Sequence, residues 1–163
     1  MNGVLNGNVL HGRTAIITGA SQGLGLEIAM QYVAAGASVI ICARDEGVLS
    51  EAADVLKRSA SNDQVISHIV ADVVESEAVD ALVEFAIDRM GRIDILVNNA
   101  GIYGPKGPTD SVDWAQWVQA INVNLLGSVL MCRGVITHMK RQGYGKIVQL
   151  SGGGATNPLP NLS

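Results

Sequence analysis

Hydrophobic residues follow two alternating patterns along the chain. Short apolar runs rich in β-branched residues predict buried strands at residues 13–18, 38–43, 64–70, 94–97 and 146–150. Between them, apolar positions recur every three or four residues and predict helices at residues 24–35, around 48–56, around 79–90, and over 113–140. Strands that alternate with helices are typical of a parallel sheet covered on both faces, so the pattern predicts an α/β, Rossmann-like doubly wound fold.

The connections between these elements also predict the order of the strands. Right-handed crossovers give the spatial order 3-2-1-4-5, and ligands of such sheets bind beyond the carboxyl ends of strands one and four. The long helix should cover one face of this sheet. Its apolar positions expected to face inward are Trp117, Val118, Ile121, Leu125, Val129, Cys132, Val135 and Met139.

A glycine-rich loop, TGASQGLG at residues 18–25, follows the first predicted strand and opens the first predicted helix. Its first glycine permits a tight turn, its second lets the backbone approach a pyrophosphate, and its third lets the helix pack close to the sheet. The N–H groups at the helix start would bind the anion. The alternative is a tight turn without a ligand. The residues predicted to bind the cofactor here are Gly19, Ser21, Gln22, Gly23, Leu24 and Gly25.

The spacing Thr-Gly-x-x-x-Gly-x-Gly resembles that of the short-chain dehydrogenase/reductase family, and three further motifs follow in the family's order. Asp72, followed by Val73, stands after the third strand, where the family places a carboxylate against the adenine amino group. The run NNAG at residues 98–101 follows the fourth strand. Asn124, in the run NVNL, falls on the family's catalytic asparagine. The resemblance covers residues 12 to about 151, which correspond to the family's N-terminal, cofactor-binding portion.

The resemblance implies a nicotinamide cofactor, and the end of the second strand bears on which one. NAD-binding relatives usually place an acid there for the ribose 2′-OH, but this position holds Ala43. Arg44 follows, and its guanidinium can pair with a 2′-phosphate, so NADP(H) is favoured. NAD(H) stays an alternative, since Asp45 would serve as the ribose acid if the register slipped by two. The other residues expected at the cofactor are Asp72, Val73, Asn99, Ala100 and Gly101.

The same resemblance implies hydride transfer to a carbonyl, with a tyrosine as proton donor, a lysine four residues later, and a serine that holds the substrate oxygen. On the family's spacing the Tyr-x-x-x-Lys pair would fall just past Ser163, and the serine position holds Gly152, after Ser151. Asn124 is therefore the one catalytic residue expected at its family position. We expect residues 1–163 to form a single NAD(P)-binding domain that is C-terminally incomplete, lacks the family's last strands, and is inactive alone.

The function expected from these motifs is that of an NADP(H)-dependent oxidoreductase acting on a ketone or a secondary alcohol. The alternative is a non-catalytic dinucleotide-binding or interaction subunit. The glycine at position 152 favours the alternative, whereas Asn124 and the intact glycine loop favour the enzyme. The partners expected are a small-molecule carbonyl or alcohol and, for the intact protein, further copies of itself.

Composition and charge narrow the remaining classes. A formal net charge of -4, without a basic stripe, argues against a nucleic-acid partner. No apolar run approaches the length of a membrane span, and the first eight residues lack the pattern of a signal peptide, so we expect no membrane partner and a cytoplasmic location. The two cysteines, Cys42 and Cys132, lie in apolar runs and are expected in the core. No metal-ligand spacing occurs, so no metal is expected.

Overall fold

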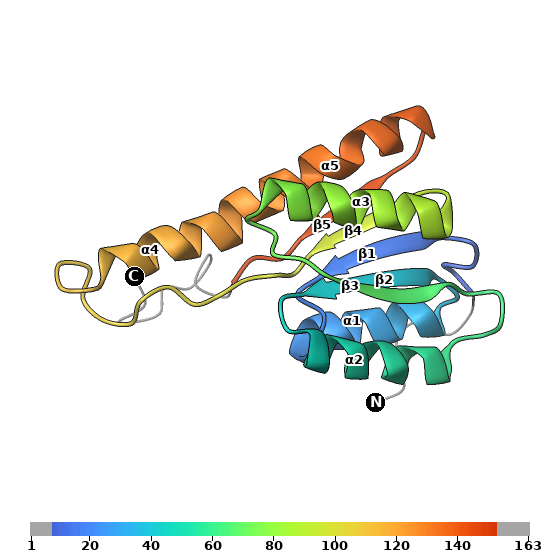
Figure 1. The fold of residues 1–163 in the computed structure, drawn as a ribbon, viewed down its shortest axis with the longest axis horizontal. Coiled ribbons are helices and arrows are strands. Elements are labelled where there is room, and N and C mark those ends of the chain that lie inside the picture. The colour runs from blue at the N-terminus through green and yellow to red at the C-terminus, as the bar shows by residue number, and fades with distance from the viewer. Residues whose placement is uncertain (1–7, 153–163) are drawn as a thin grey trace.

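Five parallel strands form the central sheet of the computed structural model, which describes residues 8–152 (Figure 1). Their order is β3-β2-β1-β4-β5, which confirms the predicted doubly wound topology. The strands are β1 (Thr14–Thr18), β2 (Ser38–Ala43), β3 (Ile66–Val70), β4 (Ile95–Asn98) and β5 (Lys146–Gln149).

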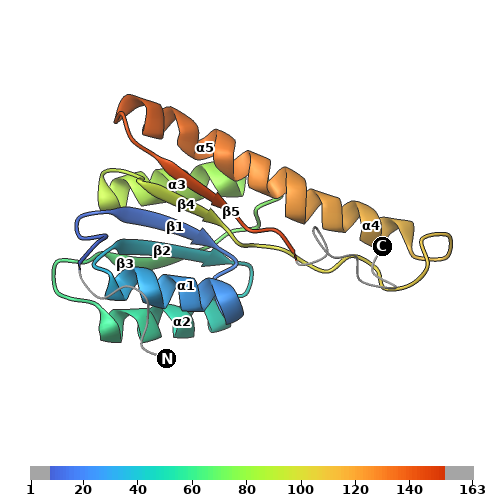
Figure 2. The ribbon, with the colours of Figure 1, turned by 180° about the vertical axis from the view of Figure 1, so that it is seen from behind.

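Helices cover both faces of this sheet. One face carries α1 (Gly23–Ala34) and α2 (Glu46–Ser59), and the other carries α3 (Ser76–Met90) and α5 (Ser128–Arg141), as Figures 1 and 2 show from opposite sides. The α5 helix continues without a break from α4 (Trp114–Ile121) through a π-helical turn, η1 (Asn122–Gly127). The predicted helix over residues 113–140 is therefore confirmed as one long element, but with a wider turn in its middle.

The buried side chains form two cores, one on each face of the sheet. Ile16 and Leu96 pack with α3 and α5, whereas their neighbours Ile17 and Val97 pack with α1 and α2. This division follows from the pleat of a strand, which points successive side chains to opposite faces. Because both faces of β1, β2 and β4 are covered, these strands are nearly continuous in hydrophobic residues, which is why the sequence pattern predicted them well.

The long helix buries only part of the face that the sequence predicted: Val135 and Met139 are buried as expected. Val118, Ile121, Leu125 and Val129 are between 40% and 58% exposed. The helix carries apolar residues around more than one side, and the wide turn η1 changes the register between α4 and α5. The residues buried by this helix are Ala120, Val123, Gly127, Ser128, Met131, Val135 and Met139.

Two further expectations need correction. The third strand begins at Ile66 rather than at residue 64, because the Gln64 amide donates to the Val33 and Ala37 carbonyls at 2.8 and 2.6 Å and holds the preceding turn. The helix Trp114–Arg141 is also long and apolar enough, by length and composition, to cross a membrane, contrary to the sequence expectation. A single helix of this kind is weak evidence for a membrane span, since a helix that covers a sheet passes the same test.

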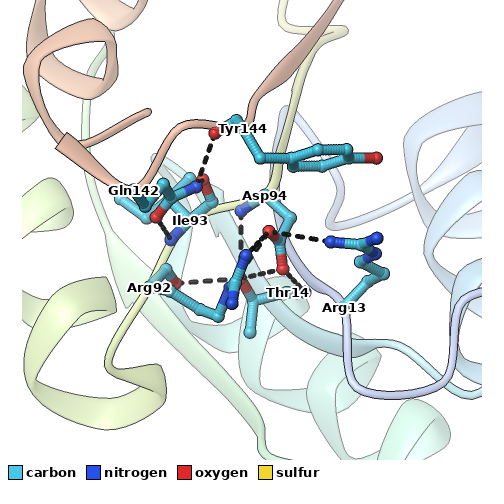
Figure 3. Close-up of polar contacts among 7 residues, drawn as sticks. All are labelled: Arg13, Thr14, Arg92, Ile93, Asp94, Gln142 and Tyr144. Atoms are coloured by element: carbon cyan, nitrogen blue, oxygen red, sulfur yellow. Dashed lines mark hydrogen bonds and ion pairs between the residues drawn. The ribbon is translucent and has the colours of Figure 1, made fainter. Parts of the chain in front are cut away.

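A buried carboxylate joins the strands at their amino ends. Asp94, which is fully buried just before β4, accepts hydrogen bonds from the Thr14 N–H at 3.1 Å and from Arg92 Nε at 3.0 Å (Figure 3). Arg13 Nη1 lies 3.5 Å from the same carboxylate, and its guanidinium stacks 4.2 Å from the ring centre of Tyr144. These contacts join the start of β1, the start of β4 and the segment that leads into β5.

Gln142 closes the same end of the sheet from the long helix. Its Nε2 donates to the Ile93 carbonyl at 2.6 Å and to the Tyr144 carbonyl at 2.7 Å (Figure 3). The end of α5 is thereby attached to the residues that precede both β4 and β5.

Candidate functional site

The glycine loop at the carboxyl end of β1 packs directly against the NNAG segment that follows β4. Gly19 has φ +63°, and a Cβ there would lie 2.7 Å from Ala100 Cα. Gly23 has φ +59°, the left-handed region that favours glycine. Gly19 therefore has both a positive φ and no room for a side chain, whereas Gly23 favours glycine through its φ alone.

Thr18 and Asn99 hold this loop in place. The Thr18 hydroxyl oxygen accepts from the backbone N–H groups of Asn99 and Ala100 at 3.1 and 3.0 Å. In return, Asn99 Nδ2 donates to the Thr18 and Gly19 carbonyls, both at 2.9 Å. A Cβ on Gly25 would collide with this amide and with the Gly19 carbonyl. The absence of a side chain at Gly25 therefore leaves the space in which the Asn99 amide binds the loop.

The amino end of α1 differs from the amino end of α2. Gln22 precedes α1 without a side-chain cap, and the first turn holds no acidic residue. In α2, by contrast, Asp45 accepts from the Val48 N–H at 3.1 Å and Glu46 lies in the first turn. The first N–H groups of α1 are thus left to bind an anion with the positive end of the helix dipole.

A cavity of about 300 Å³ lies among the loops that follow the carboxyl ends of β1 to β4. Its volume falls at the lower end of the range for small-ligand sites. The predicted residues that line it are Gly19, Ser21, Gln22, Arg44, Asp72, Val73, Ala100 and Gly101. Predicted residues that do not line it are Gly23, Leu24, Gly25, Asn99 and Asn124.

Six further residues line this cavity that the sequence did not predict as cofactor-binding residues. Ile102 and Val123 line it, and each directly follows or precedes a motif residue, which was a usable signal. Ala43 and Asp45 entered the sequence analysis only in the choice between NADP(H) and NAD(H). Cys42 and Ala71 were not predicted to line the cavity at all. Burial raises the pKa of the Cys42 thiol to about 12, although a backbone hydrogen bond from Gly19 lowers it slightly.

Three charged residues are among those that line the cavity. Arg44 Nη1 lies 4.0 Å from Asp72 Oδ2, and the Arg44 side chain is 60% exposed. Asp72 Oδ1 also accepts from the Val74 N–H at 3.2 Å, which orients the carboxylate. Asp45 lies beside them, but its carboxylate caps α2. Among residues 8–152, no group of three or more His, Cys, Asp or Glu side chains is placed to hold a metal ion.

Asn124 lies in η1 and hydrogen-bonds to the backbone of the loop after β4. Its Oδ1 accepts from the Ile102 N–H at 2.8 Å, and its Nδ2 donates to the Ile102 carbonyl at 2.9 Å. A Cβ on Gly101 would lie 3.2 Å from Asn124 Oδ1. Asn124 thus contacts the backbone beside the cavity without lining it, and it does so from a π-helical turn, a feature frequent at functional sites.

The other predicted catalytic position lies at the end of the described chain. Ser151 and Gly152 are exposed just past β5, and a Cβ on Gly152 would meet no atom of residues 8–152 within 4 Å. Within the described part of the chain, a serine side chain at residue 152 would therefore displace no neighbour.

The sequence and the fold were compared with known proteins. A family model described as short chain dehydrogenase matches residues 13–163. The (2S)-[(R)-hydroxy(phenyl)methyl]succinyl-CoA dehydrogenase subunit BbsD of Thauera aromatica is 38% identical over 142 residues, which are 87% of this chain and 56% of the relative. The chain thus spans about half the length of the curated relatives it matches.

Solved structures show the same fold. NAD+-bound xylitol dehydrogenase superposes with a TM-score of 0.89 at 25% identity, over 94% of this chain and 58% of that one. Actinorhodin polyketide ketoreductase with NADPH superposes with a TM-score of 0.86 at 30% identity, over 92% of this chain and 57% of that one.

Proposed function

Since the chain belongs to the short-chain dehydrogenase family, we propose that it binds NADP(H) in the cavity at the carboxyl end of the sheet. We further propose that the whole protein transfers hydride between this cofactor and a ketone or a secondary alcohol. The observation that carries the proposal is the uncapped start of α1 behind a glycine loop that lines the cavity.

The loop supports binding of the pyrophosphate. Gly19, Ser21 and Gln22 line the cavity, and the first N–H groups of α1 lie directly behind them. Backbone N–H groups with a helix dipole bind phosphate without a basic side chain. Asn99 and Gly25 are proposed to act indirectly, since they hold the Gly19 carbonyl and the helix start in place.

Arg44 supports NADP(H) over NAD(H). The residue at the end of β2 is Ala43, whose side chain offers no acceptor for a ribose 2′-OH, and Asp45 uses one of its carboxylate oxygens to cap α2. Arg44 lies at 4.0 Å from Asp72, a long contact on an exposed side chain, so a 2′-phosphate would be a stronger partner for its guanidinium. Relatives of this fold hold either cofactor, NAD+ in xylitol dehydrogenase and NADPH in the ketoreductase.

Asn124 is the residue of this chain proposed to act at the nicotinamide end. When bound, the cofactor would supply the hydride. The double hydrogen bond to Ile102 fixes both the loop after β4 and the main chain of η1, and so fixes the wall against which the nicotinamide end would lie. The non-catalytic alternative is not favoured, because the relatives named above are dehydrogenases or reductases.

The exposed apolar side chains of α4, η1 and α5 support a further proposal, that the whole protein assembles with copies of itself. Contiguous exposed apolar side chains on a folded protein mark interaction surfaces. They are formed by Val118, Ile121, Leu125, Leu126, Val129 and Ile136.

The cofactor proposal is tested by titrating NADPH and NADH against the wild type and Arg44→Ala. We expect the variant to lose about 10- to 100-fold in affinity for NADPH, since a charge-assisted pair is removed, and to change by less than about threefold for NADH. Arg58→Ala, the same change at an exposed position near the end of α2, is the matched control. Tighter binding of NADH by the wild type would show that the cofactor is wrong.

The activity is tested with the full-length protein, NADPH and a panel of ketones. Turnover by the full-length protein, but none by residues 1–163 alone, is the expected result. Binding of dinucleotide without turnover of any ketone or alcohol would favour the non-catalytic alternative.

A further inference from the structure

Gly127 ends η1 at the point where the long helix touches the loop after β3. Its backbone is ordinarily helical, with φ -59° and ψ -43°. Glycine is therefore not needed here for its conformational freedom, and it weakens a helix relative to alanine. The reason for a glycine at this position must lie in its surroundings.

Those surroundings are the backbone and side chain of Val73. A Cβ on Gly127 would lie 2.7 Å from Val73 Cγ2 and 3.2 Å from the Val73 carbonyl oxygen. Val73 is 6% exposed and lines the nucleotide cavity directly after Asp72. The missing side chain thus lets the helix lie directly on the loop that bears both residues.

Gly134 shows what a different glycine contact looks like on the same helix. Seven residues further along, a Cβ there would lie 3.0 Å from Val83 Cγ2 and 3.4 Å from Val79 Cγ1. These are side-chain atoms of α3, which can rotate or shift, and no backbone atom is among the contacts. Neither valine lines the cavity.

We propose that Gly127 is a positioning residue that sets the place of Asp72 and Val73 and thereby the affinity for the adenine half of the cofactor. The inference rests on the proposed function, since it assumes a dinucleotide in this cavity. The turn η1 then holds two walls of one site. Asn124 hydrogen-bonds to the backbone of Ile102 on the β4 side, and Gly127 packs against Val73 on the β3 side.

The test titrates 2′,5′-ADP, which carries the adenine, ribose and 2′-phosphate, and NADPH against the full-length protein by calorimetry. Gly127→Ala should weaken both by about tenfold, because overpacking displaces the loop. Gly134→Ala should leave both affinities within about twofold, even if it lowers the unfolding temperature. Unchanged affinity in a folded Gly127→Ala protein would overturn the proposal.

Rescue separates positioning from general damage. Val73→Ala removes Cγ2, the atom that the new methyl group would meet at 2.7 Å, and leaves only the milder contacts with the Val73 carbonyl oxygen and Cβ at 3.2 and 3.3 Å. In this background Gly127→Ala should therefore cost less than about threefold. This pair also decides the matter if Gly127→Ala alone does not fold. An equal cost in both backgrounds, or a double variant that does not fold, would overturn the proposal. A wild type that binds neither ligand would overturn the proposed function and this inference with it, whereas a wild type that binds both leaves the variants to decide.

Discussion

The strands β1 and β4 are joined at both ends, but by different chemistry. At the amino end, Thr14 and Asp94 meet in a buried network that includes two arginines. At the carboxyl end, Thr18 and Asn99 meet through neutral hydroxyl, amide and backbone groups. Each junction uses the hydroxyl of a β1 threonine, Thr14 at the amino end and Thr18 at the carboxyl end. The two junctions therefore differ in the residue that the β4 side contributes.

This difference fits the proposed ligand. A pyrophosphate on the glycine loop would lie close to the carboxyl-end junction, where a carboxylate would repel it and compete for the positive end of α1. The amino end faces no such ligand, and a fully buried carboxylate can be satisfied there by Arg92, Arg13 and the Thr14 N–H. Charged groups thus hold β1 and β4 together at the end away from the proposed ligand, and neutral groups hold them together at the end beside it.

Moving a charge to the neutral end should have the largest effect. Asn99→Asp replaces an amide that donates to two carbonyls with a carboxylate that faces them. We expect the loss of both bonds and the added charge to weaken NADPH binding by about 100-fold or more. Calorimetric titration of NADPH measures the effect.

The control for this variant is Asn62→Asp, which makes the same change in the exposed turn before β3. It should leave NADPH affinity within about twofold, because screening weakens a distant surface charge. If Asn99→Asp bound NADPH as tightly as Asn62→Asp does, the neutral character of the carboxyl end would have no bearing on the ligand.

Removing the charge from the other end should cost stability instead of affinity. Asp94→Asn leaves the shape but places an amide N–H₂ against groups that donate, namely Arg92 and the Thr14 N–H. We expect a loss of about 2–3 kcal/mol in the free energy of unfolding, measured by urea denaturation, since the site is fully buried. NADPH affinity should stay within about twofold, because the network lies at the other end of the strands from the cavity.

Arg13→Ala is the milder change in the same network. Its contact with Asp94 is 3.5 Å and its side chain is 38% exposed, so its loss should cost less than about 1 kcal/mol. A larger loss from Arg13→Ala than from Asp94→Asn would mean that the stacking on Tyr144, and not the buried carboxylate, holds this end.

The fold was predictable because its signals are local. The strands that are covered on both faces read as apolar runs, and the glycine loop directly follows the first of them. The start of β3 was not predictable, because the Gln64 amide bonds to carbonyls about thirty residues away in the sequence. The buried face of the long helix was predicted correctly at Val135 and Met139 but wrongly at Val118, Ile121, Leu125 and Val129. Apolar residues lie around several of its sides, and a hydrogen-bonding pattern as unusual as that of η1 leaves no periodic signal.

The candidate site shows a finer limit. Motif spacing selected Gly25, Asn99 and Asn124, yet none of these lines the cavity. Gly25 leaves room for the Asn99 amide, and Asn124 binds the backbone of Ile102. Sequence alone marks both kinds of residue alike, because a residue that holds a loop is as restricted in type as one that touches a ligand.

How well the carboxyl end excludes solvent can be tested without any substitution. Cys42 is fully buried at the end of β2, and burial raises the pKa of its thiol to about 12. At pH 8.5 the Cys42 thiol should therefore stay protonated, so iodoacetamide should label it more slowly than a thiol of ordinary pKa. Cys132, which is only partly buried, is the internal reference, and the urea-unfolded chain should lose the difference. Timed labelling followed by peptide mass spectrometry measures both rates.

Bound NADPH should slow the labelling of Cys42 further, because this residue lines the cavity. Equal labelling of the two cysteines in the folded protein would instead show that water reaches Cys42 at the bottom of the cavity.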